Sequence, residues 1–185
     1  MAGIKLTELK QEISKYIGIP YFMNTGKHKN SSPEASLVGK GNAKEIALKT
    51  VELANQEGVK ILELDSNQIY RFQKKHHLGI DCSGLCCQLL NFYFDAQLNV
   101  RRTNANMLTS SPLSKKVNIN DVKTGDLIRQ KRGHHVLFVI EKIDQQIIYV
   151  HSSLSNHGVH YGQIDINQDQ EQFKEGFFRL LLLNQ

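Results

Sequence analysis

The chain has 185 residues, 40% of them hydrophobic, which is enough for one domain whose core needs no covalent cross-links. Its net charge of +5 and pI near 9.1 favour anionic partners in general, including nucleic acid, membrane surfaces and acidic cell-wall polymers. The basic residues form short scattered groups that are not interleaved with aromatic residues, so no nucleic-acid groove is predicted. No stretch approaches the roughly twenty apolar residues of a membrane span.

The N-terminal segment, residues 1–19, mixes charged and apolar residues at helical spacing and lacks the continuous apolar core of a secretory signal. We therefore expect a chain synthesised in the cytoplasm without a signal peptide; whether it acts there or is exported by a route other than Sec stays open. Cys82, Cys86 and Cys87 are the only cysteines and lie too close together for a disulfide framework. The sequence predicts reduced thiols.

The first half of the chain predicts two helices. The first covers residues 5–16, with Thr7 as a possible cap, and the second covers 42–57 and stops at Gly58. The apolar positions of the second helix are Ile46, Leu48, Val51 and Leu53. A loop is expected over residues 24–33, and the segments 61–64 and 68–72 are ambiguous between helix and strand.

The second half predicts one buried helix followed by strands. Residues 85–98 are apolar around most of a helix and should form the most buried helix of the protein. Residues 101–112 are irregular, with a possible short helix over 104–108. The expected strands cover residues 126–130, 135–140, 147–151 and 177–183.

Cys82 lies where a loop becomes the buried helix. Asp81 or Ser83 can cap that helix, and Gly84 keeps its first turn narrow. The free amides and the macrodipole of a helix N-terminus lower a thiol pKa below its usual value of roughly 8.5, which would make Cys82 a candidate nucleophile. The same residue could be an ordinary small core residue, and this stretch alone does not decide between the two.

Two histidines complete a possible thiol-activating set. His135 opens an apolar strand and His151 closes the next one, so one can act as a base while the other orients it. They share a sheet face only if the hairpin has an odd-length loop or a bulge. His134 should point to the opposite face of the strand. The remaining histidines, expected to face solvent, are His28, His76, His77, His157 and His160.

A zinc site built from Cys82, Cys86 and a histidine is the competing interpretation. No C-x-x-C pair is present and Cys86 is followed directly by Cys87, so the spacing matches no zinc module. We therefore expect no metal site.

Six short motifs follow one another in an order that is informative as a set. They are Gly18-Ile19-Pro20-Tyr21, Asp81-Cys82-Ser83-Gly84-Leu85, Arg102-Thr103, Gly125-Asp126-Leu127, His135-Val136 and Tyr149-Val150-His151-Ser152. This order resembles that of the NlpC family of papain-like cysteine peptidases. The resemblance spans Gly18 to about Arg179, and its specificity lies in the ordered set because each motif alone is short.

The resemblance implies an α+β, papain-like fold, in which a central antiparallel sheet packs against helices and the nucleophilic cysteine starts a buried helix. It implies one catalytic domain over residues 1–185, with a lid or specificity insertion at 24–79. Cys82 would be the nucleophile, His135 the base and acid, and His151 the residue that orients His135. Residues implied beside the site are Tyr21, Asp81, Ser83, Gly84 and, next to the base, His134. The implied substrate is a peptidoglycan peptide or muropeptide, and no cofactor is implied.

The sequence departs from the family pattern in three respects, one of which is the missing secretory signal noted above. Tyr21 is separated from Cys82 by a long insertion, and Leu137 stands where the family usually has a small residue. Three hypotheses follow. The first is a peptidoglycan amidase or endopeptidase, with an exported toxin or effector as one version of it. The second is a deamidase, protease or acyltransferase of the same fold, and the third is a non-catalytic binding module. Retention of Cys82, His135 and His151 argues against the third. The scissile bond and the oligomeric state do not follow from the sequence.

Overall fold

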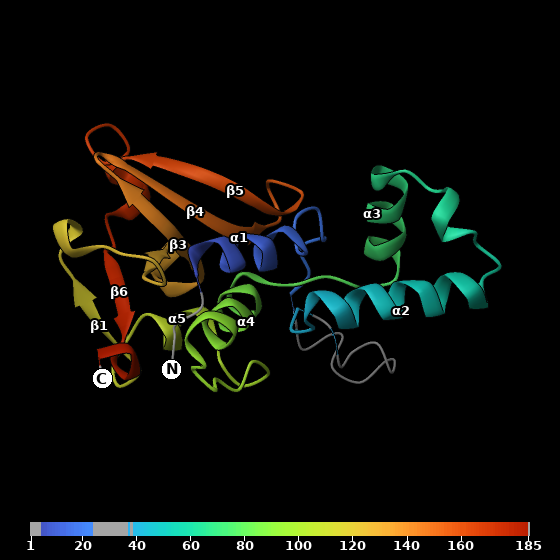
Figure 1. Cartoon of the computed structure of the whole chain (residues 1–185), viewed down its shortest axis with the longest axis horizontal. Helices are drawn as coiled ribbons and strands as arrows, with labels where there is room; N and C mark the ends of the chain where they lie inside the picture. Colours follow the sequence, from blue (N-terminus) through green and yellow to red (C-terminus); the bar gives the residue numbers. More distant parts are fainter. Residues whose placement is uncertain (1–4, 24–36, 38, 185) are drawn as a thin grey trace.

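The computed structural model describes residues 5–23, 37 and 39–184 (Figure 1). Its helices are α1 (Leu6–Ser14), α2 (Ala43–Gln56), α3 (Ser66–Lys75), α4 (Cys82–Phe94) and α5 (Ala105–Leu108). Its strands are β1 (Ser114–Val117), β2 (Leu127–Gln130), β3 (His135–Ile143), β4 (Gln146–Ser153), β5 (Gly158–Asp165) and β6 (Phe177–Leu180). The expected loop at 24–33 lies outside the described residues.

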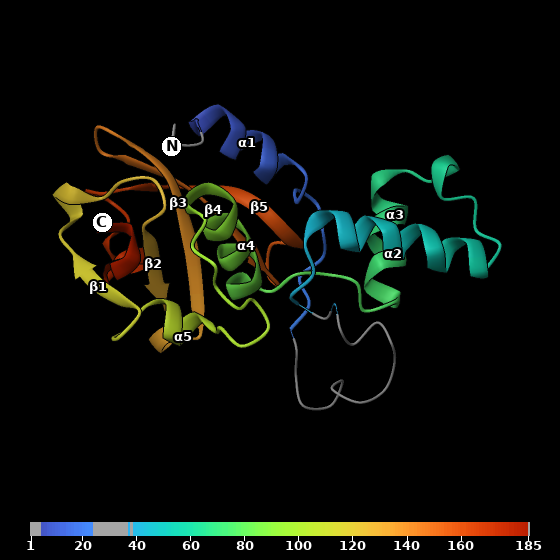
Figure 2. The ribbon, with the colours of Figure 1, turned by 60° about the horizontal axis from the view of Figure 1, so that its bottom comes forward.

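All six strands form one antiparallel sheet in the order β1-β6-β2-β3-β4-β5. Helices α1 and α4 lie on one side of this sheet, as the two ribbon views show (Figures 1 and 2). The α+β class expected from the sequence is confirmed. None of the described helices is both long and apolar enough to cross a bilayer.

Helix α4 is the centre of the main core. The Asp81 carboxylate caps it by accepting the Gly84 N–H at 2.6 Å, and Asp95, in the left-handed region at φ 52°, ends it. Every residue from Cys82 to Leu90 except Gln88 is buried. The helix was expected over 85–98; it starts three residues earlier because the Asp81 cap includes Cys82 in the first turn, and it ends four residues earlier, at Phe94, where Asp95 leaves the helical conformation.

The β3–β4 hairpin contains a bulge that sets which side chains share a face. Ile143 pairs with Gln146 across a two-residue turn, which alone would place His135 and His151 on opposite faces. The register shifts between Val139 and Glu141, so one extra residue restores a common face. The expectation that these histidines need an odd loop or a bulge to share a face is confirmed.

Two expectations are wrong, one about the cap of α1 and one about the buried face of α2. Thr7 does not cap α1, whose N-cap is Lys5 without a side-chain hydrogen bond. In α2, Leu48 and Val51 are 62% and 44% exposed, because the buried stripe runs along another set of positions. That stripe consists of Ala43, Ile46, Thr50, Leu53 and Ala54. Asn42 and Glu45 form a capping box at its start, and Gly58 follows its end at φ +68°.

The C-terminal strand is shorter than expected. Strand β6 stops at Leu180, and residues 181–184 form a 3-10 turn in which Leu181 and Leu182 are exposed. Strands β1 and β5 were not predicted. The ambiguous segment 61–64 contains a 3-10 turn over 61–63, and 68–72 lies within α3. Helices α2 and α3 project to the side of the sheet in both ribbon views (Figures 1 and 2).

Candidate active site

Cys82 is the first residue of α4 and is 5% exposed. It lines a cavity of about 520 Å³ together with Tyr21, Lys40 and His134. The backbone N–H groups of Val136 and Ser83 interact with its thiol. Because Val136 directly follows His135, the packing of α4 on β3 brings the sulfur to the peptide group that links His135 and Val136.

The surroundings of Cys82 favour the protonated thiol over the thiolate. Burial, followed by the nearby Asp81 carboxylate, raises its pKa to about 11. The Val136 N–H, the Lys40 ammonium and the Ser83 N–H act in the opposite direction but do not overcome burial. The expectation of a lowered thiol pKa is wrong here, because desolvation of a nearly enclosed sulfur outweighs the field of the helix terminus.

His135 and His151 form a buried hydrogen-bonded pair. His135 Nε2 lies 2.8 Å from His151 Nδ1, and the two side chains belong to residues only 7% and 8% exposed. Burial lowers the pKa of His135 to about 4 and that of His151 to about 3, with smaller contributions from neighbouring cations and histidines. Both rings are therefore neutral near pH 7. The second ring nitrogen of His135, Nδ1, takes no part in this hydrogen bond.

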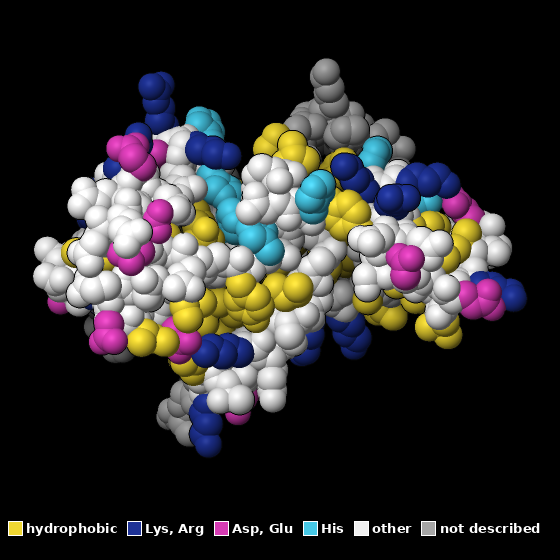
Figure 3. All heavy atoms as spheres, turned by 90° about the horizontal axis from the view of Figure 1, so that it is seen from above, with side chains coloured by type: hydrophobic (Ala, Val, Ile, Leu, Met, Phe, Trp, Pro, Cys, Tyr) yellow, Lys and Arg dark blue, Asp and Glu magenta, His cyan; other side chains and the backbone are white. Residues whose placement is uncertain are grey.

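A third histidine extends this pair. His160 on β5 is the direct strand partner of His151, and their Nε2 atoms lie 2.7 Å apart. The expectation that His160 faces solvent is wrong, because β5 was not predicted and its pairing with β4 places the ring beside His151. On the face seen in Figure 3, histidine side chains gather near the middle, beside a hollow in the surface.

The other histidines differ in their surroundings. His134 is exposed and lines the Cys82 cavity. His77 and His157 are also exposed, whereas His76 is partly buried and pairs with Glu57 at 3.1 Å, contrary to expectation. His28 lies outside the described residues.

The segment 18–21 is held against the site by backbone hydrogen bonds. The Ile80 N–H donates to the Pro20 carbonyl at 3.0 Å, and Gly18 and Ile19 exchange hydrogen bonds with Val159. Tyr21 therefore lines the same cavity as Cys82 despite the long intervening insertion. Burial, and then the proximity of Cys82, raise the pKa of the Tyr21 hydroxyl.

Gly84 permits a close backbone crossing at the start of α4. A Cβ at this position would lie 2.1 Å from the Gly39 carbonyl oxygen. No Cβ atom fits at that distance unless the backbone shifts. The Asp81 N–H donates to that same carbonyl at 3.0 Å. The insertion is thus joined to the helix N-terminus by backbone contacts, and glycine at position 84 is required for them.

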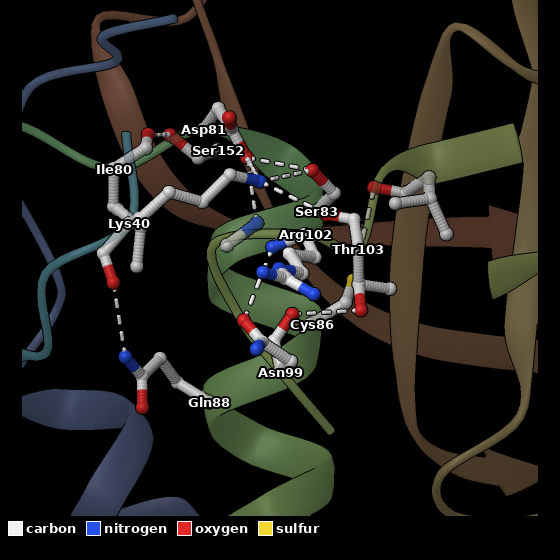
Figure 4. A network of polar contacts seen from close by, with 12 residues as sticks. Lys40, Ile80, Asp81, Ser83, Cys86, Gln88, Asn99, Arg102, Thr103 and Ser152 are labelled. Carbon is white, nitrogen blue, oxygen red and sulfur yellow. Dashed lines mark hydrogen bonds and ion pairs between the residues drawn. The ribbon is translucent and has the colours of Figure 1, made fainter. Parts of the chain in front are cut away.

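Lys40 was not identified from the sequence, although it lies at the centre of a polar network beside Cys82 (Figure 4). Its ammonium donates to Ser83 Oγ at 2.7 Å, Asp81 Oδ1 at 3.1 Å and the Thr103 carbonyl at 3.2 Å. The Lys40 and Asp81 side chains are each only 9% exposed. The sole sequence signal was a lysine between two glycines ahead of the α2 cap, and nothing in it pointed to a residue 41 positions away.

The three cysteines are free, and Cys86 and Cys87 are completely buried, as expected for core residues. Within the described part of the chain, no group of three or more histidine, cysteine, aspartate or glutamate side chains has the arrangement of a metal site.

Comparison with known families adds a decisive observation. The model of the NlpC/P60 family matches residues 67–176, more than half of the chain. The chain belongs to the NlpC/P60 family. Its fold is accordingly papain-like, as the resemblance implied, and members of the family are generally cysteine-type hydrolases. Comparison with curated proteins and with solved structures gives no significant match.

The NlpC/P60 match includes some site residues and excludes others. Cys82, His135 and His151 lie within the matched range, and so does His160. Tyr21 and Lys40 precede it, although both line the cavity that contains Cys82. The site of this NlpC/P60 chain is therefore assembled from the family region and from the segment before it.

Proposed function

We propose that this NlpC/P60 protein is a cysteine hydrolase that cleaves amide bonds in peptidoglycan stem peptides through Cys82, His135 and His151. The observation that carries the proposal is the buried His135–His151 pair next to the peptide group that contacts the Cys82 thiol. A neutral imidazole with one free nitrogen is the form that accepts a thiol proton. Family membership supplies the reaction class and the expected substrate.

The proposed reaction needs no group beyond the chain, the substrate and water. His135 Nδ1 takes the proton of Cys82 as the sulfur attacks the substrate carbonyl, and the carbonyl carbon becomes tetrahedral. The Cys82 N–H, at the first position of α4, has no acceptor within its helix and is placed to stabilise the oxyanion. His135 then returns the proton to the leaving nitrogen as the C–N bond breaks, and water hydrolyses the thioester.

The charge around the cavity supports an anionic substrate. Arg101 and Arg102 line the cavity and are exposed, whereas the deeper Lys40 is already paired with Asp81. Carboxylates of a wall peptide are complementary to this arrangement, since arginine binds carboxylates through two parallel hydrogen bonds.

Mass spectrometry of fragments released from purified peptidoglycan tests the proposal. Wild type is expected to release peptides with new amine and carboxyl ends, and Cys82→Ala to release none. Cys87→Ala is the matched control, because Cys87 is on the same helix but is completely buried. If peptidoglycan stays intact while iodoacetamide labels Cys82 selectively, the wall substrate is wrong and the deamidase, protease or acyltransferase alternative is favoured.

The identity of the base is tested by comparing two adjacent histidines. His134 lines the cavity and His135 is bonded to His151, so both are near the nucleophile. We expect His135→Ala to lower kcat by roughly a thousandfold or more and His134→Ala by less than tenfold. The reverse order would assign the base to His134.

A further inference from the structure

We infer that His160 is a positioning residue that fixes the tautomers of His151 and His135 and thereby keeps Nδ1 of His135 free to act as the base. The inference goes beyond the three residues of the proposed function. Its kinetic part rests on that function, whereas its spectroscopic part does not. It is carried by a series of hydrogen bonds whose direction is set at one end by a backbone carbonyl.

The series of hydrogen bonds ends at a backbone carbonyl, which can only accept a hydrogen bond. His160 Nδ1 lies 3.1 Å from the carbonyl oxygen of Gly158, so Nδ1 must carry the proton. In the neutral His160 ring the proton on Nδ1 leaves the single lone pair on Nε2, which therefore accepts. The side-chain amide of Asn156 also lies 2.7 Å from this nitrogen.

The tautomer of His160 in turn fixes the tautomers of His151 and His135. Because His160 Nε2 accepts, His151 must donate to it through its own Nε2–H over the 2.7 Å contact. Neutral His151 then has an unprotonated Nδ1, which accepts the Nε2–H of His135 at 2.8 Å. His135 is left with an unprotonated Nδ1. The Gly158 carbonyl thus determines which nitrogen of His135 is basic, through two intermediate rings.

The geometry that maintains this series of hydrogen bonds is built into the sheet. His151 and His160 are direct partners in the β4–β5 ladder, so their rings share a face without any adjustment of either strand. Gly158, whose carbonyl orients His160, is the first residue of β5, and Asn156 lies in the short segment that connects β4 to it. When His135 becomes protonated during catalysis, this series of hydrogen bonds presents an acceptor to its Nε2–H and stabilises the imidazolium.

Substitutions at His160 separate positioning from simple structural support. His160→Gln can keep an acceptor oxygen near the position of Nε2, whereas His160→Ala removes it. His160→Lys places an obligate donor there, which would force His151 and His135 into the opposite tautomers and put a proton on His135 Nδ1. We expect kcat to follow the order wild type, Gln, Ala, Lys. The loss is about tenfold for Ala and on the order of a hundredfold or more for Lys, with KM nearly unchanged.

Nitrogen-15 NMR of histidine-labelled protein reads the tautomers without any substrate. In wild type, His135 and His151 are both expected to be protonated at Nε2, and His160 at Nδ1. His160→Ala should give mixed tautomers at His151 and His135, whereas His157→Ala, an exposed histidine in the same turn, should change neither. Urea midpoints of all variants show whether each one is folded.

The outcomes distinguish this inference from the proposed function. If wild type has a proton on Nδ1 of His135 or His151, or if folded His160→Ala keeps the wild-type tautomers, the inference is wrong. If the tautomers follow the expectation but no variant, including wild type, cleaves peptidoglycan, the positioning role stands and the substrate proposal fails. Equal kcat for folded Gln, Ala and Lys variants would also overturn the positioning role.

Discussion

The buried Lys40–Asp81 pair gives the sharpest prediction about stability. Lys40→Met keeps most of the side-chain volume but removes the charge that Asp81 Oδ1 contacts at 3.1 Å. Breaking a buried ion pair on one side costs about 3–5 kcal/mol, because the remaining charge is left uncompensated. Asp81 retains the Gly84 N–H at 2.6 Å and the Ser83 hydroxyl at 2.8 Å, so we expect a loss of about 3 kcal/mol, near the lower limit.

Urea unfolding followed by circular dichroism measures this loss. Lys60→Met is the matched control, since Lys60 and its partner Glu63 are 77% and 67% exposed and such pairs contribute less than about 1 kcal/mol. The expected fall in Tm for Lys40→Met is about 6–12 °C. Adding Asp81→Asn removes the stranded charge and should recover at least about 1.5 kcal/mol. A midpoint for Lys40→Met equal to that of Lys60→Met would refute the role assigned to this pair.

Three further predictions concern titration and packing. Burial lowers the pKa of His135 to about 4 and of His151 to about 3, so the free energy of unfolding should be at its full value above pH 6.5 and fall as pH drops toward these pKa values, by up to about 1.4 kcal/mol per pH unit for each histidine. A His135→Gln, His151→Gln double variant should show a shallower fall. An unchanged slope in that variant would contradict the assignment. Cys82 lines the cavity, so iodoacetamide should label it faster than the fully buried cysteines; because its pKa is raised to about 11, the labelling rate should keep rising with pH above 8, and a plateau near pH 7 would instead indicate a resting thiolate. Gly84→Ala should lower the unfolding free energy by about 2 kcal/mol or more because its Cβ meets the Gly39 carbonyl, and a urea midpoint within error of wild type would show that the crossing can relax.

Local patterns predicted the parts of the site that depend on local structure. The position of Cys82 at a helix start, the Asp81 cap and the apolar strand after His135 all follow from residue types within a few positions of each other. The long-range contacts did not follow in the same way. Lys40 and Tyr21 reach the cavity through backbone pairings with Ile80 and its neighbours, and no periodicity in either segment signals such a pairing.

The errors have physical causes of the same kind. A helix N-terminus favours a thiolate, but the depth at which Cys82 is buried depends on tertiary packing and reverses the expected pKa shift. His160 was expected to face solvent because the residues around it in the sequence are polar and loop-like, and only its pairing opposite His151 reveals its surroundings. The lid or specificity role of the insertion at 24–79 stays a prediction, and part of that insertion lies outside the described residues.

The bulge between Val139 and Glu141 constrains how this hairpin can change in length during evolution. A single-residue insertion or deletion between His135 and His151 that leaves the bulge in place would rotate one histidine to the other side of the sheet and separate the pair. Changes of two residues, or a one-residue change that removes the bulge, would preserve the contact. Relatives with hairpins of other lengths should therefore differ by an even number of residues, or carry a different number of bulges between the two histidines.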